Sequence, residues 1–287
     1  MNFAKHRWGL FHWFNGIFFL LFATATFYPL WHEISVSLSS PEGAARGGFF
    51  FLPREINGEA YQTVLDSPYI WRAYTNSAFI TMTGTILSTF LTACTAYPLV
   101  IRGLPAKRSI TLAILFTMLF SGGMIPAYLL VKSLGLVNTL WAVIIPSAIS
   151  AYNVLVMRSF FETLPYELEE SAMMDGANPI VTFCLIILPL STPVLATIAL
   201  WEAVGLWNNF LQSLIYLNDK SLYTLPLLLR DIINGQQAAM QSGEFSKTST
   251  DSVIAATVIL TILPILCIYP FLQKYFTKGV MIGAIKS

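Results

Sequence analysis

The chain has 287 residues, of which 55% are hydrophobic and 11% are charged, whereas charged residues make up roughly 25% of an ordinary soluble domain. This composition excludes a typical soluble enzyme. The net charge is +1, and no clustered basic face indicates nucleic-acid binding.

The charged residues leave six long gaps along the chain, each of at least 22 residues. A helix that rises 1.5 Å per residue needs about 20 apolar residues to cross the hydrocarbon core of a bilayer. The sequence therefore predicts an all-α polytopic membrane protein with six transmembrane helices. In chain order, the predicted spans are residues 14–31, 76–101, 110–131, 140–156, 181–201 and 253–272.

The first span imitates a signal peptide in its first half, because Lys5 and Arg7 precede an apolar run and the small residues Ala23 and Ala25 follow it. The apolar stretch continues to Trp31. This continuation favours a retained membrane anchor, and a cleaved signal peptide is the alternative.

Lysine and arginine predict the orientation of the spans. With the N-terminus inside, the inner segments hold nine of the 16 Lys and Arg residues, and most of the others lie in two long outer loops. The positive-inside rule counts short loops most heavily, so we expect both termini in the cytoplasm. The expected organisation is a first span with its external loop over 1–71, a core transmembrane domain over 72–273 and a cytoplasmic tail over 274–287.

Two kinds of residue within the spans bear on transport. Glu202 is a candidate ion-coupling residue, but it falls at the outer end of the fifth predicted span, where an interfacial carboxylate that reaches water is the alternative reading. Eight of the 15 prolines lie in or at the ends of spans. They either bend helices around a pathway or belong to ordinary packing of the bundle.

Motifs for catalysis or cofactor binding are missing from the sequence. No GxxxxGK[ST] phosphate loop is present, so the chain does not hold ATP in that way. There is also no HExxH, GxSxG or paired-carboxylate pattern. Cys94, Cys184 and Cys267 lie in apolar runs without CxxC spacing, which indicates small apolar side chains rather than a disulfide or a metal site. We therefore expect no enzyme activity, and no cofactor or metal bound by this chain.

The inner loop 157–180 is acidic and predicts a short helix over 165–175. Thr163 is the expected cap, Pro165 lies in the first turn, acidic residues follow near the positive helix end, and Gly176 ends the helix. This helix is too short to cross a membrane. It is expected on the cytoplasmic side.

One face of this predicted helix suits a docking surface. Tyr166, Glu170, Met173 and Met174 share that face by their spacing, and Ala172 leaves room for close backbone approach. The alternative is a helix that lies on the membrane, for which lysines are expected on the polar face. Their absence favours a protein partner.

At this loop the sequence resembles the membrane subunits of bacterial ATP-binding-cassette importers. Their motif reads E-A-A, three residues, G, nine residues, I-x-L-P. The matching residues are Glu170-Ser171-Ala172, Gly176 and Ile186-Ile187-Leu188-Pro189, with both spacings kept and Ser171 in place of the first alanine. The resemblance implies that these residues and their neighbours couple the chain to an ATPase. The implied coupling residues are Tyr166, Glu169, Glu170, Ser171, Ala172, Met173, Met174, Asp175, Gly176, Ile186, Leu188 and Pro189.

Further stretches look like the carbohydrate branch of this family, at 120–126, 134–139, 207–208 and 273–287. They are similar to the second permease subunit of maltose importers and to importers of oligosaccharides and polysaccharides, alginate among them. The resemblance implies one half of a pathway for a carbohydrate in the bacterial cytoplasmic membrane. The implied partners are a second, different permease subunit, two ATPase subunits that bind ATP and Mg, and an extracytoplasmic solute-binding protein.

Candidate substrate contacts are less specific in the sequence. Asn153, Trp207, Asn208 and Asn209 are the candidates, because amides hydrogen-bond hydroxyl groups and Trp stacks on sugar rings; packing is the alternative for each. An acidic sugar would favour the basic groups available near the outer mouth, which are Arg72, Lys132 and Arg230. Three other functions stay open: a permease for another small solute, a stand-alone secondary carrier or channel, and a membrane scaffold.

Overall fold

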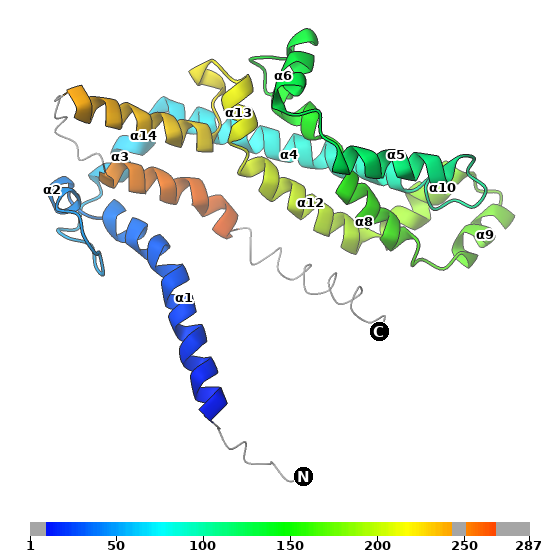
Figure 1. Ribbon diagram of the computed structural model, residues 1–287, viewed down its shortest axis with the longest axis horizontal. Helices are drawn as coiled ribbons and strands as arrows, with labels where there is room; N and C mark the ends of the chain where they lie inside the picture. Colours follow the sequence, from blue (N-terminus) through cyan, green and yellow to red (C-terminus); the bar gives the residue numbers. More distant parts are fainter. Residues whose placement is uncertain (1–9, 243–250, 268–287) are drawn as a thin grey trace. The chain divides into compact units, whose positions relative to one another are not determined.

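The computed structural model describes residues 10–242 and 251–267 (Figure 1). These residues form helices, and the only β pairing among them is an isolated bridge between Ser39 and Ile56. The predicted all-α fold is confirmed. The chain divides into two compact units, one with residues up to Ser67 and Leu229–Leu263, the other with Pro68–Leu228 and residues from Pro264 onward.

The first unit holds the long N-terminal helix and a small core. Helix α1 is long and apolar enough to cross a membrane, and its side chains are exposed over most of its length, for example Phe14 and Leu20. The core joins Val36, Ala44, Phe50 and Ala255. Because the apolar face of α1 is uncovered in this chain, it suits a lipid or protein environment. The helices of this unit are α1 (Leu10–Ser37), α2 (Pro41–Ala45), α3 (Glu59–Leu65), most of α14 (Leu225–Ser242) and the helix Asp251–Cys267.

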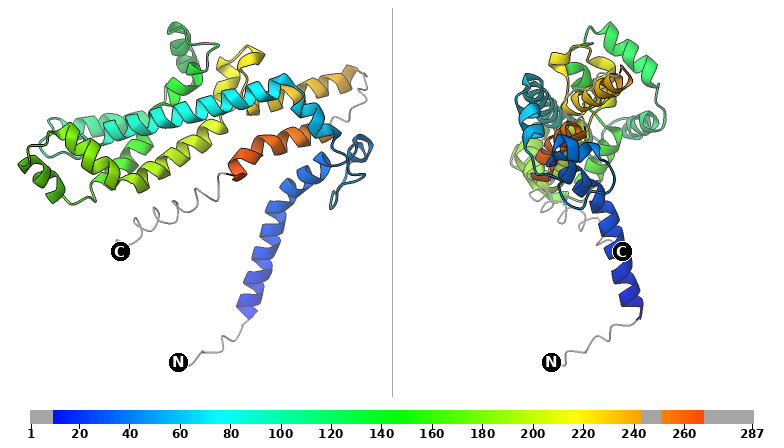
Figure 2. Two further views of the ribbon diagram at one scale, coloured as in Figure 1. Left: turned by 180° about the vertical axis from the view of Figure 1, so that it is seen from behind. Right: turned by 90° about the vertical axis from the view of Figure 1, so that its left-hand side faces the viewer.

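The second unit is a bundle built along α4, which lies beside α12 and also packs on α8 (Figures 1 and 2). Its helices are α4 (Pro68–Ala96), α5 (Lys107–Leu119), α6 (Met124–Ser133), α7 (Trp141–Ile144), η1 (Ile145–Ser147), α8 (Ala151–Phe161), α9 (Glu167–Met174), α10 (Pro179–Thr182), the π-helical turn η2 (Phe183–Ile187), α11 (Leu188–Leu190), α12 (Thr192–Trp207), α13 (Leu211–Tyr216) and η3 (Lys220–Leu222).

Small residues let α4 and α12 approach closely. Ser77, Gly84 and Ser88 are buried on α4, and a Cβ added to Gly84 would lie 2.6 Å from a methyl carbon of Leu206 on α12. Membrane helices pack by close van der Waals contact, because lipid gives no hydrophobic driving force between them, and small residues at i, i+4 spacing allow this contact. The small residues of α4 therefore allow its close contact with α12.

The six predicted spans all fall on helical segments, but three of these segments are bent. Two helices are straight candidate spans, Phe11–Ser37 and Pro68–Ala96. The bent pairs are Lys107–Leu119 with Met124–Ser133 (110°), Trp141–Ser147 with Ala151–Phe161 (48°), and Pro179–Leu190 with Thr192–Trp207 (79°). Pro126, Pro146, Pro189 and Pro193 lie at or beside these bends, because proline removes a helical N–H group and its ring clashes with the preceding turn. The sixth predicted span coincides with Asp251–Cys267 up to residue 267, and its last residues lie outside the described chain.

Candidate functional site: helix α9 and the end of the bundle that carries it

Helix α9 forms at one end of the second unit, close to the ends of α4 and α8 (Figure 1). It runs from Glu167 to Met174 and is shorter than the predicted 165–175. The predicted cap at Thr163 is wrong, because the Thr163 hydroxyl donates a hydrogen bond back to the Phe160 carbonyl at 2.7 Å. Tyr166 stands at the N-cap position instead and makes no side-chain cap bond. The acidic residues of the first turn still lie at the positive end of the helix dipole.

Gly176 ends α9 as the sequence predicted. Its φ is +84°, a left-handed conformation that glycine adopts without a steric penalty. The Gly176 N–H donates to the Met173 carbonyl at 3.0 Å, and the Ala177 N–H donates to the Ala172 carbonyl at 2.9 Å. This pair of bonds is the Schellman arrangement, which satisfies the free carbonyls of a helix end. The motif therefore has glycine at this position because the backbone that ends α9 is left-handed there.

The exposed face of α9 carries acids and methionines. Met173 is 48% and Met174 89% exposed, and Glu170 and Asp175 are exposed as well. Ala172 is buried, so it packs toward its own chain and does not leave room for a partner as predicted. Tyr166 is only half-exposed, because the Arg102 guanidinium lies 3.8 Å above the centre of its ring. Of the four residues predicted on this face of α9, only Glu170, Met173 and Met174 are exposed.

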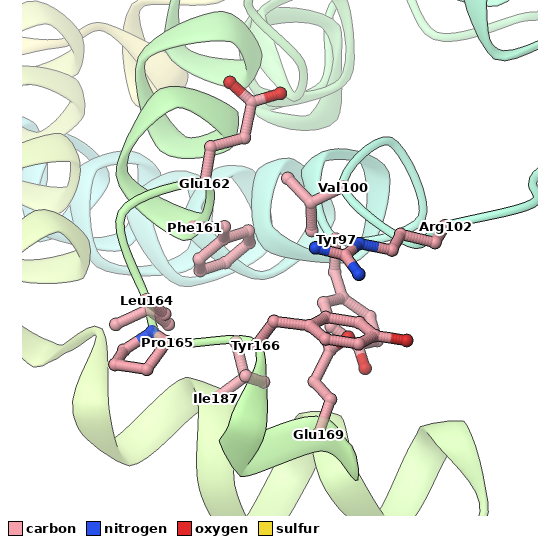
Figure 3. Close-up of a pocket in the computed structure, with 10 residues that line it drawn as sticks. All are labelled: Tyr97, Val100, Arg102, Phe161, Glu162, Leu164, Pro165, Tyr166, Glu169 and Ile187. Carbon is pink, nitrogen blue, oxygen red and sulfur yellow. The ribbon is translucent and has the colours of Figure 1, made fainter.

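Tyr97 connects α9 to the rest of the bundle (Figure 3). It lies just beyond the end of α4, its ring stacks on Phe183 with centroids 4.9 Å apart, and it meets Phe161 edge-on at 6.3 Å. Its side chain lies next to the buried Glu169 carboxylate. Burial, together with the neighbouring Glu169 charge, raises the pKa of Tyr97 to about 12, so the phenol stays protonated at neutral pH.

A small pocket of about 150 Å³ separates α9 from the bundle (Figure 3). It is lined by Tyr97, Val100, Arg102, Phe161, Glu162, Leu164, Pro165, Tyr166, Glu169 and Ile187. Only Tyr166 and Glu169 of this set were predicted as coupling residues. Tyr97 and Arg102 had no local signal in the sequence, because each acts across the fold on a helix more than 60 residues away.

The second half of the motif is partly buried against the bundle. Ile187 is buried and packs in one core cluster with Tyr97, Phe161 and Phe183, and Leu188 lies against it, whereas Pro189 is exposed. The segment begins at Asn178, whose side chain accepts a hydrogen bond from the Val181 N–H at 2.9 Å, and it passes through the π-helical turn η2. π-helical turns often occur at functional sites. The motif thus joins an exposed helix to a partly buried, irregular one.

The five acids of the loop 157–180 have different environments. Glu162 pairs with Arg158 at 2.9 Å, and Glu169 is buried next to Tyr97. The other three, Glu167, Glu170 and Asp175, are exposed. These three give the free side of α9 a negative charge.

The substrate candidates do not form one site. Asn153 on α8 is buried, and its side-chain amide donates to the Glu202 carboxylate on α12 at 2.5 Å. Asn208 and Asn209 lie at the far end of α12, where they donate to the Val204 carbonyl (2.9 Å) and to Gln212 (2.8 Å), and Trp207 precedes them. Helix α12 continues five residues beyond Glu202, to Trp207.

The basic residues named for an acidic substrate are exposed, but they lie in different units. Arg72 and Lys132 belong to the second unit and Arg230 to the first. The described residues contain no group of three His, Cys, Asp or Glu side chains that could hold a metal.

Sequence comparison decides the family. Residues 77–282, which include α9 and the whole motif, match the family described as the inner membrane component of binding-protein-dependent transport systems. The chain belongs to this family. It is therefore a membrane permease, whose transport system also has a partner permease, a separate ATPase chain and a solute-binding protein.

Relatives of the permease cover nearly its whole length. It is 38% identical over 274 residues to the polygalacturonan/rhamnogalacturonan transport system permease protein YtcP of Bacillus subtilis (strain 168), covering 94% of this chain and 96% of the relative. It is 41% identical over 265 residues to protein LplC of the same organism, covering 91% and 90%. A crystal structure of a bacterial ABC transporter involved in the import of the acidic polysaccharide alginate aligns with a TM-score of 0.87 and 31% identity, covering 96% of this chain and 100% of that one.

Proposed function

We propose that this permease forms one half of the membrane pathway of an oligosaccharide importer. The proposal is supported by its relatives, one of which is named for polygalacturonan and rhamnogalacturonan and another of which belongs to an alginate importer. The uncharged spans argue against a carrier that works alone, because ion-coupled carriers need ionisable residues at membrane depth. Glu202 alone among the acidic residues lies well inside a described bundle span.

Helix α9 is the proposed binding site for an ATPase subunit, and the observation that carries this function is its attachment to the bundle. The exposed Glu170, Met173 and Met174 face outward, while Glu169 is tied to Tyr97 inside. A partner that binds α9 differently in its two nucleotide states would shift the permease between two conformations. Because Tyr97 also stacks on Phe183, the displacement would reach the π-helical turn of the motif.

The proposed assembly contains two different permease chains, with an ATPase subunit on the α9 helix of each. ATP and Mg are held by those ATPase subunits, and an extracytoplasmic binding protein delivers the carbohydrate. The positive-inside distribution supports a bacterial cytoplasmic membrane location with both termini in the cytoplasm. Residues 72–273 are the proposed transport core, with 1–71 as a peripheral span and external loop and 274–287 as a cytoplasmic tail.

The test is a coupling assay on the complex that co-purifies with this chain, reconstituted in proteoliposomes with its binding protein. Glu170→Lys reverses a charge on the exposed face of α9, and we expect ATP hydrolysis that no longer drives uptake. Glu59→Lys is the matched control, because Glu59 is also an exposed acid in the first turn of a short helix. If Glu170→Lys shows wild-type uptake together with stimulated ATP hydrolysis, the coupling role of α9 is overturned. Uptake by this chain alone, driven by an ion gradient, would overturn the function.

A further inference from the structure

The centre of the second unit contains a polar cluster that the coupling mechanism does not use. It is made by three helices that pack on one another, α4, α8 and α12. The Asn153 amide donates to the Glu202 carboxylate, and the fully buried Ser88 lies beside the same carboxylate. Asn153 is 5% exposed, whereas Glu202 is partly exposed.

The cluster lies two to three turns from one end of each helix. Ser88 is eight residues from the end of α4, Asn153 is eight residues from the end of α8, and Glu202 is ten residues from the start of α12. At 1.5 Å per residue, these separations along the helices are about 12–15 Å.

An ionisable side chain inside a candidate membrane span, such as Glu202, needs a functional or a structural reason, because burying a charge in a bilayer is costly. Asn153 also lies in the first turn of α8, directly after the break that bends its span by 48°. Discontinuous helices are a common feature of substrate sites in transporters. The ionisable residue is therefore hydrogen-bonded to a residue at a helix break.

Two aromatic rings adjoin the cluster. Tyr152 precedes Asn153 on α8, Trp201 precedes Glu202 on α12, and the two ring centroids are 5.8 Å apart. Tyr152 is 53% exposed. A carboxylate can accept hydrogen bonds from sugar hydroxyl groups, and aromatic rings pack on apolar faces. This combination matches the chemistry of a sugar ring, which has polar edges and apolar C–H faces.

We propose that Glu202, Tyr152 and Trp201 form a binding site for one neutral, hydroxyl-rich sugar residue during passage, with Asn153 as the residue that positions the Glu202 carboxylate. The site rests on the proposed oligosaccharide function and specifies its substrate contacts. Glu202 accepts sugar hydroxyls, and the two rings pack on the sugar face. A sugar that carries its own carboxylate at this point would meet Glu202 as a like charge.

The test compares two trisaccharides that differ only at C6, galactotriose and trigalacturonate, in proteoliposomes with the full complex. Glutamine keeps the shape of Glu202 but removes its charge. We expect Glu202→Gln to lower galactotriose uptake about tenfold, the loss of one hydrogen bond to a charged group. Trigalacturonate uptake should fall less, because the repulsion is removed as well. The ratio of acidic to neutral uptake should therefore rise.

Two further variants separate contact from folding. Tyr152→Leu should raise the half-saturating concentration for galactotriose several-fold, since this exposed position tolerates a change in size. Asn153→Ala should also raise the half-saturating concentration for galactotriose, and the yield of assembled complex is measured for both variants. Glu59→Gln is the control with a distant exposed carboxylate.

The outcomes distinguish a failure of the proposed binding site from a failure of the proposed oligosaccharide function. An unchanged uptake ratio in Glu202→Gln, or an equal fall for both sugars, would overturn the site, since a purely structural carboxylate affects both sugars alike. If the wild-type complex takes up neither trisaccharide nor any other oligosaccharide, the proposed function falls and the site falls with it. A raised ratio of acidic to neutral uptake in Glu202→Gln, together with a higher half-saturating concentration in Tyr152→Leu, supports both the binding site and the oligosaccharide function.

Discussion

The interaction between the Tyr97 hydroxyl and the Glu169 carboxylate can be removed by deleting one atom. Tyr97→Phe deletes the hydroxyl and leaves the ring on Phe183. Because Tyr97 is 6% and Glu169 8% exposed, water replaces the lost interaction poorly. A hydrogen bond to a charged group contributes about 1.5–3 kcal/mol, and about 2 kcal/mol would make detachment of α9 about 30-fold more frequent.

Hydrogen exchange of the α9 backbone measures this detachment. The Glu170 and Asp175 N–H groups bond within the helix to Tyr166 and Ser171, and we expect their exchange to accelerate about 30-fold in Tyr97→Phe. Tyr69→Phe is the matched control, because Tyr69 is 49% exposed. Exchange in Tyr97→Phe within twofold of wild type would refute the reasoning.

The same interaction predicts a pH dependence of α9 attachment. The pKa of Tyr97 rises from 10.0 to about 12 in the folded protein. When α9 detaches and Tyr97 meets water, the phenol loses its proton near pH 10, so the attached state binds more protons between pH 10 and 12. Attachment should therefore be constant from pH 6 to 8 and weaken as the pH rises from 10 to 12. Tyr97→Phe should abolish this dependence, and persistence of the weakening in that variant would assign it to another group.

Two glycine positions give further predictions. Gly176→Ala places a Cβ at φ +84°, which should cost about 1–2 kcal/mol and lower ATP-driven uptake without loss of the complex. The control is Gly135→Ala, at φ +69° in a distant turn. Equal uptake in both variants would contradict the role of Gly176. Gly84→Ala places a Cβ 2.6 Å from the flexible Leu206 side chain and should cost about 1–3 kcal/mol as a lower melting temperature in detergent. Gly205→Ala on α12, where a Cβ meets nothing within 4 Å, should melt as wild type does, and a similar loss in both would show that helix contact at Gly84 is not the cause.

The sequence alone predicted those features that depend on local chemistry. Charge-free stretches of sufficient length specify membrane helices, whatever those helices contact. Gly176 predicted the end of α9, because a left-handed residue is a property of one backbone position. The spaced motif that contains Glu170 and Pro189 predicted the family in the same way, since its spacing is visible in the chain itself.

Only the tertiary structure decided which side chains meet. Hydropathy ended the fifth predicted span just before Glu202, but α12 continues to Trp207 and the Glu202 carboxylate accepts a hydrogen bond from Asn153 on α8. Tyr97 and Arg102 are ordinary residues near a helix end until the loop 157–180 folds back over them. Such contacts join residues 49 to 72 positions apart, and no local pattern records them, because hydrogen bonds and ring contacts between helices depend on how the helices pack and not on the spacing along either one.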